Sequence, residues 1–370
     1  MIKYTTLGNL IAPAKVIRCG KGSFPVLSMT MHDGIVLQSE RFKKSLASID
    51  QSDYKVVKRG QLVVGFPIDE GVLYVQKAAD EGIMSPAYNV WDIDTEKVDA
   101  DFLELCLHSP QSMQYYKDKL RGTTARRRSI PTADLLALRI RLPDMQTQRE
   151  VVAIMRKTEA VIAARQEQLN SFEQLVKSRF IELFGDPVLN QHGWRKAALE
   201  VNATLLNGRA YKQDELLDSG KYPVLRVGNF FSNRGWYYSD LELDDDKYCD
   251  NGDLLYAWSA SFGPQIWNGG KVIYHYHIWK VLVGEAYNKQ FLCKLLEYAT
   301  ESLMGDTHGI AMMHLTKSGM EKTEFIVPPI ELQEQFAAFV EQTDKSKLAV
   351  QKGLQELELL KKSLMQQYFG

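Results

Sequence analysis

The chain has 370 residues, of which 45% are hydrophobic and 25% are charged, and its formal net charge at pH 7 is -1. This length predicts two or three domains, each large enough for its own core, and the composition is typical of soluble globular proteins. The near-neutral charge argues against a general nucleic-acid binder, because such proteins carry an excess of lysine and arginine. The sequence shows neither an apolar run of 18 residues nor a secretory signal, so we expect a cytoplasmic protein without membrane spans.

Sequence patterns of common enzymes are missing. The four cysteines lie far apart, which excludes a cysteine zinc site and a disulfide framework, and they indicate a reducing compartment. We find no GxxxxGK[ST] phosphate loop, no GxGxxG after a strand and no HExxH. His275 and His277 flank Tyr276 on a predicted strand, where they are either metal ligands or, more commonly, part of a hydrogen-bonded face. We therefore expect no catalytic residues, no metal and no cofactor in this chain.

Short β-branched and aromatic runs separated by Gly and Pro predict strands in the first 140 residues. The runs begin at Phe24, Tyr54, Gln61 and Gly71. Residues 101–120 have helical spacing of apolar positions and predict one helix. The first region is therefore predicted to be a compact mixed unit of strands and helices.

A long helix is predicted next. Pro143-Asp144 is a helix-start signal, and about forty residues without Pro or Gly follow, up to Gly185. Apolar residues recur at three- and four-residue steps and predict a seam with another long helix. The residues that we expect to pack there are Phe172, Val176 and Phe180 in this segment, and Leu354, Leu357 and Leu364 at the end of the chain.

The second half repeats this organisation. Strands are predicted at Tyr222, Asp253, Phe325 and across residues 271–283, and a helix at residues 290–304. Residues 142–185 and 327–370 align without a gap at an offset of 185, with 13 identities in 44 positions. Weaker echoes pair PheProValLeu at Phe24 with TyrProValLeu at Tyr222, Gly60 with Gly252, and Asp101 with Gln290. The chain is therefore predicted to be duplicated, with the two long helices antiparallel.

Candidate DNA contacts follow from polar, basic and aromatic groups in predicted loops and short polar segments. Guanidinium groups can hold phosphates or contact guanine in a bidentate way, and aromatic rings can stack on bases. An exposed basic loop or a core aromatic group is the alternative role at each position. In the first region the candidates are Arg121, Thr123, Thr124, Arg126, Arg127, Arg128, Ser28, Thr30, Lys43 and Lys44. In the second region they are Arg226, Asn229, Arg234, Tyr237, Ser259, Ser261 and His308.

The duplicated chain resembles the specificity subunit of type I DNA restriction-modification systems. The residues that carry the resemblance are ValProProIleGluLeuGlnGluGlnPhe from Val327, LeuProAspMetGlnThrGlnArgGlu from Leu142, LeuPheGlyAspPro from Leu183 and GlyAspLeuLeu from Gly252. Asp144 replaces the second Pro of the usual helix-start pattern in the first copy. The resemblance covers essentially the whole chain.

The resemblance implies a mixed α+β fold with two target recognition domains, residues 1–141 and 186–326, and two spacer helices, residues 142–185 and 327–370. It also implies a non-catalytic subunit in which each recognition domain binds one half of a split DNA target. Two DNA adenine methyltransferase subunits would dock on the helices, and motor/nuclease subunits would join for cleavage. S-adenosylmethionine, ATP and Mg²⁺ would then belong to those partners. The alternatives are a duplicated protein-binding scaffold without DNA specificity and a nuclease with an unrecognised carboxylate cluster.

Overall fold

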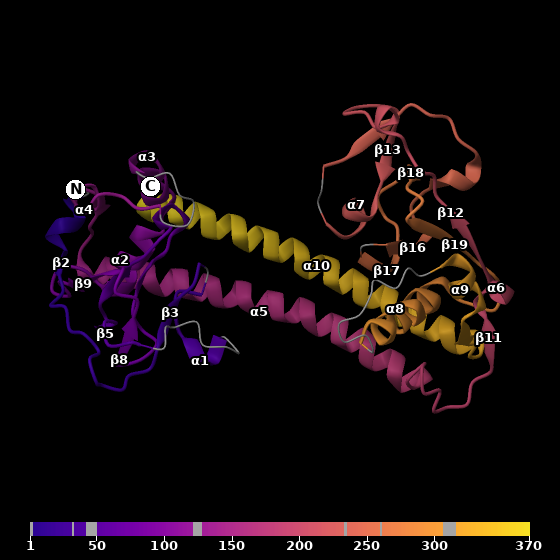
Figure 1. The fold of residues 1–370 in the computed structure, drawn as a ribbon, viewed down its shortest axis with the longest axis horizontal. Helices are drawn as coiled ribbons and strands as arrows, with labels where there is room; N and C mark the ends of the chain where they lie inside the picture. Colours follow the sequence, from indigo (N-terminus) through magenta and orange to yellow (C-terminus); the bar gives the residue numbers. More distant parts are fainter. Residues whose placement is uncertain are drawn as a thin grey trace. The chain divides into compact units, whose positions relative to one another are not determined.

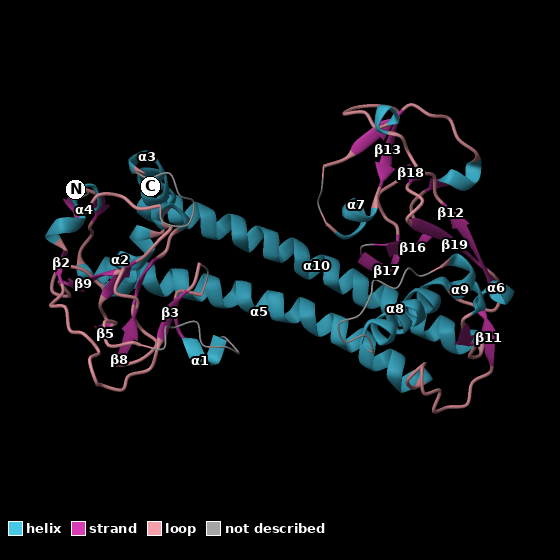
Figure 2. Cartoon of the chain, in the orientation of Figure 1, coloured by secondary structure: helices cyan, strands magenta, loops and turns pink. Residues whose placement is uncertain are grey.

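The computed structural model describes residues 3–31, 33–41, 50–120, 128–232, 235–259, 261–305 and 316–370. The chain divides into two compact units (Figure 1). Unit 1 contains Met1–Gln166 and Lys352–Gly370, and unit 2 contains Glu167–Gln351. Each unit combines helices with strands (Figure 2), which confirms the mixed fold class.

Each unit contains an antiparallel four-stranded sheet with the same order of equivalent strands. In unit 1 the order is β2-β9-β6-β7, formed by Ile11–Pro13, Asn89–Ile93, Leu62–Val64 and Leu73–Val75. In unit 2 the order is β12-β19-β16-β17, formed by Ala203–Asn207, Ile278–Val283, Leu254–Ser259 and Ser261–Ile266. A two-stranded pair accompanies each sheet, β1 (Tyr4–Thr6) with β10 (Arg139–Arg141) and β11 (Lys196–Ala198) with β20 (Glu324–Ile326). The predicted duplication is therefore present in the strand topology.

The weak sequence echoes fall on equivalent elements of the two units. Gly60 and Gly252 precede β6 and β16, and both have left-handed backbones with φ of 87° and 90°, which glycine adopts without a steric penalty. Val26 forms a parallel bridge with Ile83, and Val224 pairs in parallel with Ile273. The PheProValLeu and TyrProValLeu segments thus occupy matching positions.

The remaining strands differ between the units. Unit 1 has the antiparallel pairs β3 (Leu27–Met29) with β4 (Ile35–Leu37), and β5 (Lys55–Lys58) with β8 (Glu81–Met84). Unit 2 has a second four-stranded sheet, ordered β14-β13-β18-β15, from Tyr237–Ser239, Tyr222–Leu225, Val272–Tyr274 and Tyr248–Cys249. The single strand predicted at residues 271–283 is wrong, because a turn after His275 divides it into β18 and β19, which belong to different sheets.

The predicted helix at residues 101–120 is also wrong in one respect. It is two helices, α2 (Ala100–Leu107) and α3 (Pro110–Lys119), because Ser109 caps α3 and Pro110 occupies its first turn. Its counterpart in unit 2 is the uninterrupted α8 (Lys289–Gly305). The shorter helices are α1 (Gln38–Arg41), α4 (Thr132–Leu136), α6 (Leu199–Asn202), α7 (Val227–Phe231), α9 (Lys317–Lys322) and the 3-10 turns Leu7–Asn9, Ile68–Glu70, Gln213–Glu215 and Asp245–Lys247.

Two forty-residue helices, α5 (Met145–Phe184) and α10 (Ile330–Phe369), contribute to both units. In unit 1 the first half of α5 packs with the end of α10, and Glu159 pairs with Lys361 at 2.8 Å. In unit 2 the second half of α5 packs with the start of α10, and Glu173 pairs with Lys347 at 2.8 Å. Within each unit the two helices are therefore antiparallel, as predicted.

The helix α5, from the first repeat, ends in the core of unit 2, and α10, from the second repeat, ends in the core of unit 1. Phe184, which ends α5, is fully buried in unit 2, with its ring centroid 4.6 Å from that of Phe291 in α8. Phe369, which ends α10, is buried in unit 1, with its ring centroid 5.4 Å from that of Phe102 in α2. Both cores are thus completed by a residue from the opposite half of the sequence.

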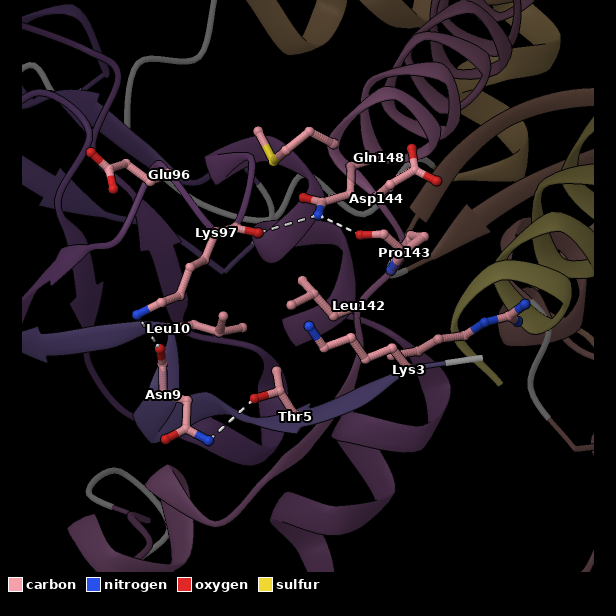
Figure 3. Close-up of a pocket in the computed structure, with 12 residues that line it drawn as sticks. Lys3, Thr5, Asn9, Leu10, Glu96, Lys97, Leu142, Pro143, Asp144 and Gln148 are labelled. Carbon is pink, nitrogen blue, oxygen red and sulfur yellow. Dashed lines mark hydrogen bonds between the residues drawn. The ribbon is translucent and has the colours of Figure 1, made fainter. Parts of the chain in front are cut away.

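A fully buried glutamine joins the start of each long helix to the start of a second helix in the same unit. Gln148 Oε1 accepts a hydrogen bond from the Asp99 N–H at 2.8 Å. Its Nε2 donates to the Pro143 carbonyl at 2.8 Å (Figure 3). Gln333 repeats this arrangement with the Asn288 N–H at 2.9 Å and the Pro328 carbonyl at 2.8 Å. Asp99 and Asn288 precede α2 and α8 and accept hydrogen bonds from their first-turn N–H groups. One side chain therefore fixes two helix starts in each unit.

The interhelical seam is less continuous than predicted. Val176 and Phe180 are buried in the unit 2 core, and Leu364 packs against the unit 1 core. Val161 of α5 and Leu348 of α10 are 37% and 54% exposed, so neither is buried between the helices. The helices bury their apolar side chains mainly against the cores of the two units. Among the described residues, no helix has the length and apolar character needed to cross a membrane.

We predict that Gln148→Leu or Gln333→Leu destabilises its unit by about 2–4 kcal/mol, because each leaves a buried N–H and a buried carbonyl without partners. Urea denaturation of the full chain measures the loss. The matched controls Gln146→Leu and Gln335→Leu change exposed glutamines on the same helices and should cost under about 0.5 kcal/mol. Equal losses in the buried and exposed variants would contradict the anchoring role.

We also predict that Phe180→Ala costs about 3–5 kcal/mol, because this fully buried ring contacts Phe184, Phe291 and Phe336. Phe172→Ala, two turns earlier on α5, should cost less than half as much, since its ring is only half-buried. The same urea titration compares the two variants. A larger loss of stability for Phe172→Ala than for Phe180→Ala would contradict the prediction, because it would place the main packing of α5 near Phe172.

Candidate nucleic-acid interface

Two described candidates of unit 1, Ser28 and Thr30, belong to the β3–β4 hairpin. Ser28 Oγ accepts a hydrogen bond from Gln38 Nε2 at 3.1 Å. Thr30 Oγ1 donates to the Gly34 carbonyl at 3.1 Å and accepts from the Asp33 N–H at 2.8 Å. These hydroxyls therefore stabilise the hairpin, and their predicted DNA contacts stay predictions. Lys43 and Lys44 lie outside the described residues.

Arg128 is paired within unit 1. Its Nη1 lies 3.0 Å from Asp69 Oδ2, and its Nη2 forms an ion pair with Glu70. Because Asp69 is almost fully buried, this pair holds the chain after the basic segment against the Ile68–Glu70 turn. A phosphate contact by Arg128 would compete with two carboxylates. The other candidates of that segment, Arg121, Thr123, Thr124, Arg126 and Arg127, lie outside the described residues.

Three candidates of unit 2 lie together. Arg226 directly follows β13 and precedes α7, and its guanidinium carbon lies 4.2 Å from the centroid of the Tyr237 ring in β14. Asn229, in α7, donates from Nδ2 to the Gly235 carbonyl at 3.2 Å. The Nε atom of Arg226 is buried and has no hydrogen-bond partner among the described residues. The contact between Arg226 and the Tyr237 ring is close enough for a cation–π interaction.

Ser259 and Ser261 face each other at the end of the β16–β17 hairpin. Both residues belong to strands, because β16 ends at Ser259 and β17 runs from Ser261 to Ile266. Gly263 in β17 is close to α7, since a Cβ atom there would lie 4.0 Å from the Phe231 ring. The hairpin end and α7 are therefore neighbours in unit 2. Arg234 and His308 lie outside the described residues.

The turn between β18 and β19 adds residues that the sequence analysis did not include among the DNA contacts. His275 and His277 do face each other, with ring centroids 4.7 Å apart, and Trp258 lies beside them. Burial, helped by repulsion from His277 and Arg226, lowers the pKa of His275 to about 4. The HisTyrHis sequence was a visible signal, but its apparent strand periodicity concealed the turn.

The helix-packing candidates divide by position. Val176 and Phe180 belong to the unit 2 core, and Leu364 packs against the unit 1 core. Phe172, Leu354 and Leu357 are half-buried. Phe172 borders a cavity of about 580 Å³ between α5, α8, α10 and β17.

A larger cavity, about 930 Å³, lies beside the start of α5 in unit 1 (Figure 3). Lys3, Lys97 and Arg141 line it together with Glu96 and Asp144, so its walls carry both signs of charge. Within the described ranges, no three His, Cys, Asp or Glu side chains are grouped to hold a metal ion.

Comparisons with known proteins link this architecture to one family. Residues 193–359 match the family model of the type I restriction modification DNA specificity domain. The type I restriction enzyme EcoBI specificity subunit of Escherichia coli is 22% identical over 179 residues, which are 46% of this chain and 38% of that protein. The alignment thus spans less than half of that relative's length.

Solved structures have the same fold along nearly the whole chain. One, described as the structural basis of complex assembly and conformational transition of the type I R-M system, superposes with a TM-score of 0.64 and 18% identity, covering 99% of this chain and 97% of its own. The type I restriction-modification S subunit from M. genitalium gives a TM-score of 0.57 and 14% identity, covering 100% and 96%. At these identities the likeness concerns the fold. For residues 193–359, the family match agrees with the resemblance seen in the sequence: this part of the chain is similar to the type I restriction modification DNA specificity domain.

Proposed function

We propose that this chain is the DNA sequence-recognition subunit of a type I restriction-modification complex. Residues 193–359 match the DNA specificity domain, and unit 1 repeats the strand order and the buried glutamine of unit 2. This repetition is the observation that carries the proposal. Each unit would bind one half of a bipartite target in double-stranded DNA. The chain recognises the sequence, and the chemistry belongs to its partners.

The charge of the chain supports assembly with other subunits. A net charge of -1 supplies little phosphate neutralisation, and Arg128, the described residue of the basic segment, is already paired with carboxylates. Two DNA adenine methyltransferase subunits would provide positive charge and enclose the duplex. They would also carry S-adenosylmethionine, while motor/nuclease subunits with ATP and Mg²⁺ would join for cleavage.

The long helices supply surfaces for those partners. Leu359 and Leu360 of α10 are 67% and 48% exposed, and Leu175 of α5 is 48% exposed. Apolar side chains on otherwise polar helices favour protein docking. We further propose that α5 and α10 set the number of base pairs between the two half-sites.

Deletion of this chain from its host should remove methylated adenine from one bipartite sequence, and restoring the chain should bring it back. Single-molecule methylome sequencing with and without the chain measures this directly. In vitro, the chain with its methyltransferase should bind that sequence with an affinity that falls as salt increases. An unchanged methylome together with protein binding alone would favour a duplicated protein-binding scaffold.

A paired insertion tests the spacing role. Seven helical residues placed after Gln166 in α5 and seven after Gln351 in α10 lie at the unit boundaries and leave each core intact. They add about 10 Å to each helix, equivalent to about three base pairs, so methylome sequencing should show the same half-sites with a gap longer by about three. Insertion in α5 alone is the control, because it breaks the antiparallel register. An unchanged gap would exclude the helices as the spacing element.

A further inference from the structure

Arg226 and His275 occupy neighbouring positions at the carboxyl ends of two adjacent strands in the second sheet of unit 2. The strands β13 and β18 are parallel, with Leu225 opposite Tyr274, so the residues that follow the two strands lie at the same end of the sheet. The His275 N–H donates to the Leu225 carbonyl at 2.9 Å, which keeps the two positions together. Two polar side chains are thereby brought side by side from segments about fifty residues apart in sequence.

The turn that carries His275 is held on two further sides. The Tyr276 N–H donates to the Arg209 carbonyl at 3.0 Å. Trp258 donates from its backbone N–H to the His277 carbonyl at 3.0 Å and from Nε1 to the Tyr276 carbonyl at 2.8 Å. Gly208 permits this packing, since a Cβ atom there would lie 2.4 Å from the carbonyl oxygens of Tyr274 and His275. The backbone groups of the turn are thus hydrogen-bonded within the unit, so a ligand would contact its side chains.

The side chains of this turn are chemically suited to base recognition without charge. Its pKa, lowered first by burial and then by electrostatic repulsion from His277 and Arg226, keeps His275 neutral at neutral pH. The His275 Nδ1 accepts a hydrogen bond from the His277 N–H at 3.4 Å, so the proton resides on Nε2, a donor for acceptors such as purine N7. The Tyr276 ring is 39% exposed and available for stacking or apolar contact.

The matching positions of unit 1 carry different chemistry. The residue after the equivalent ValLeu strand is Ser28, where unit 2 has Arg226. In unit 1, β8 is the strand equivalent to β18, and Ser85 follows it at the position that His275 has in unit 2. The same scaffold position therefore presents two short hydroxyls in one unit and a guanidinium with an imidazole in the other. Such a difference is what recognition of two unlike half-sites requires.

We propose that His275 and Tyr276, beside Arg226, determine the base preference of unit 2 within its half-site. The inference rests on the proposed function and adds residues to its recognition surface. His275 donates a hydrogen bond to a base edge, Tyr276 contacts a base or a thymine methyl group, and Arg226 supplies the adjacent positive charge.

The test uses the full chain assembled with its methyltransferase, and duplexes that carry the wild-type target and each single-base variant of it. We expect His275→Gln and Tyr276→Ala to reduce discrimination on the order of tenfold at one or two base pairs, all within one half-site. The salt dependence of affinity should be unchanged, because no charge is removed. Arg226→Gln should instead make that dependence shallower by about one phosphate contact.

His192→Gln is the matched control, because it changes an exposed histidine in the same unit at the turn after α5. It should leave discrimination at every base pair as in the wild type. Tyr276→Ala decides the outcome if His275→Gln fails to fold, since the Tyr276 ring is exposed.

Unchanged base discrimination in both variants, or equal loss in both half-sites, overturns the assignment while leaving the proposed function in place. A wild-type complex without any bipartite sequence preference overturns both.

Discussion

The structure depends on the exchange of helix ends between the two repeats. Phe184 and Phe369 occupy equivalent positions in the sequence repeat, yet each is buried against the helix of the opposite repeat, Phe291 in α8 or Phe102 in α2. Burying a phenylalanine contributes about 1.5–3 kcal/mol, a large part of the net stability of a domain. Neither repeat is therefore an independent folding unit, although each compact unit has its own core.

This shared framework allows the recognition surfaces to differ. The four-stranded sheets, the two-stranded pairs and the buried glutamines match between the units, because they hold the long helices. The second sheet differs, with two strand pairs in unit 1 and a four-stranded sheet in unit 2. Duplication thus preserves what anchors the helices and varies the surface that is proposed to contact DNA.

The sequence predicts the architecture well because its strongest signals are local. A forty-residue segment without Pro or Gly gives α5, and the ungapped repeat then gives α10. The errors arise where tertiary structure decides. Pro110 divides a helix that periodicity alone joins, and the HisTyrHis turn divides a strand whose residues alternate as in one continuous strand.

The candidate contacts were harder to predict because residue type does not reveal partners. Arg128 belongs to the most basic segment of the chain, but Asp69 and Glu70, about sixty residues earlier, already pair with it. The juxtaposition of Arg226 and His275 depends on parallel pairing of β13 with β18, which single-sequence patterns do not specify. Helix ends such as Phe184 were visible in the repeat, but the exchange between repeats was not.

The order of residues in the two units has a consequence for synthesis on the ribosome. Unit 2 is one continuous segment, Glu167–Gln351, whereas unit 1 lacks Phe369 until all of unit 2 has been translated. The nascent amino-terminal region therefore remains incompletely packed while unit 2 is translated and folds. Premature termination would release an open first unit, the kind of product that cellular proteases remove.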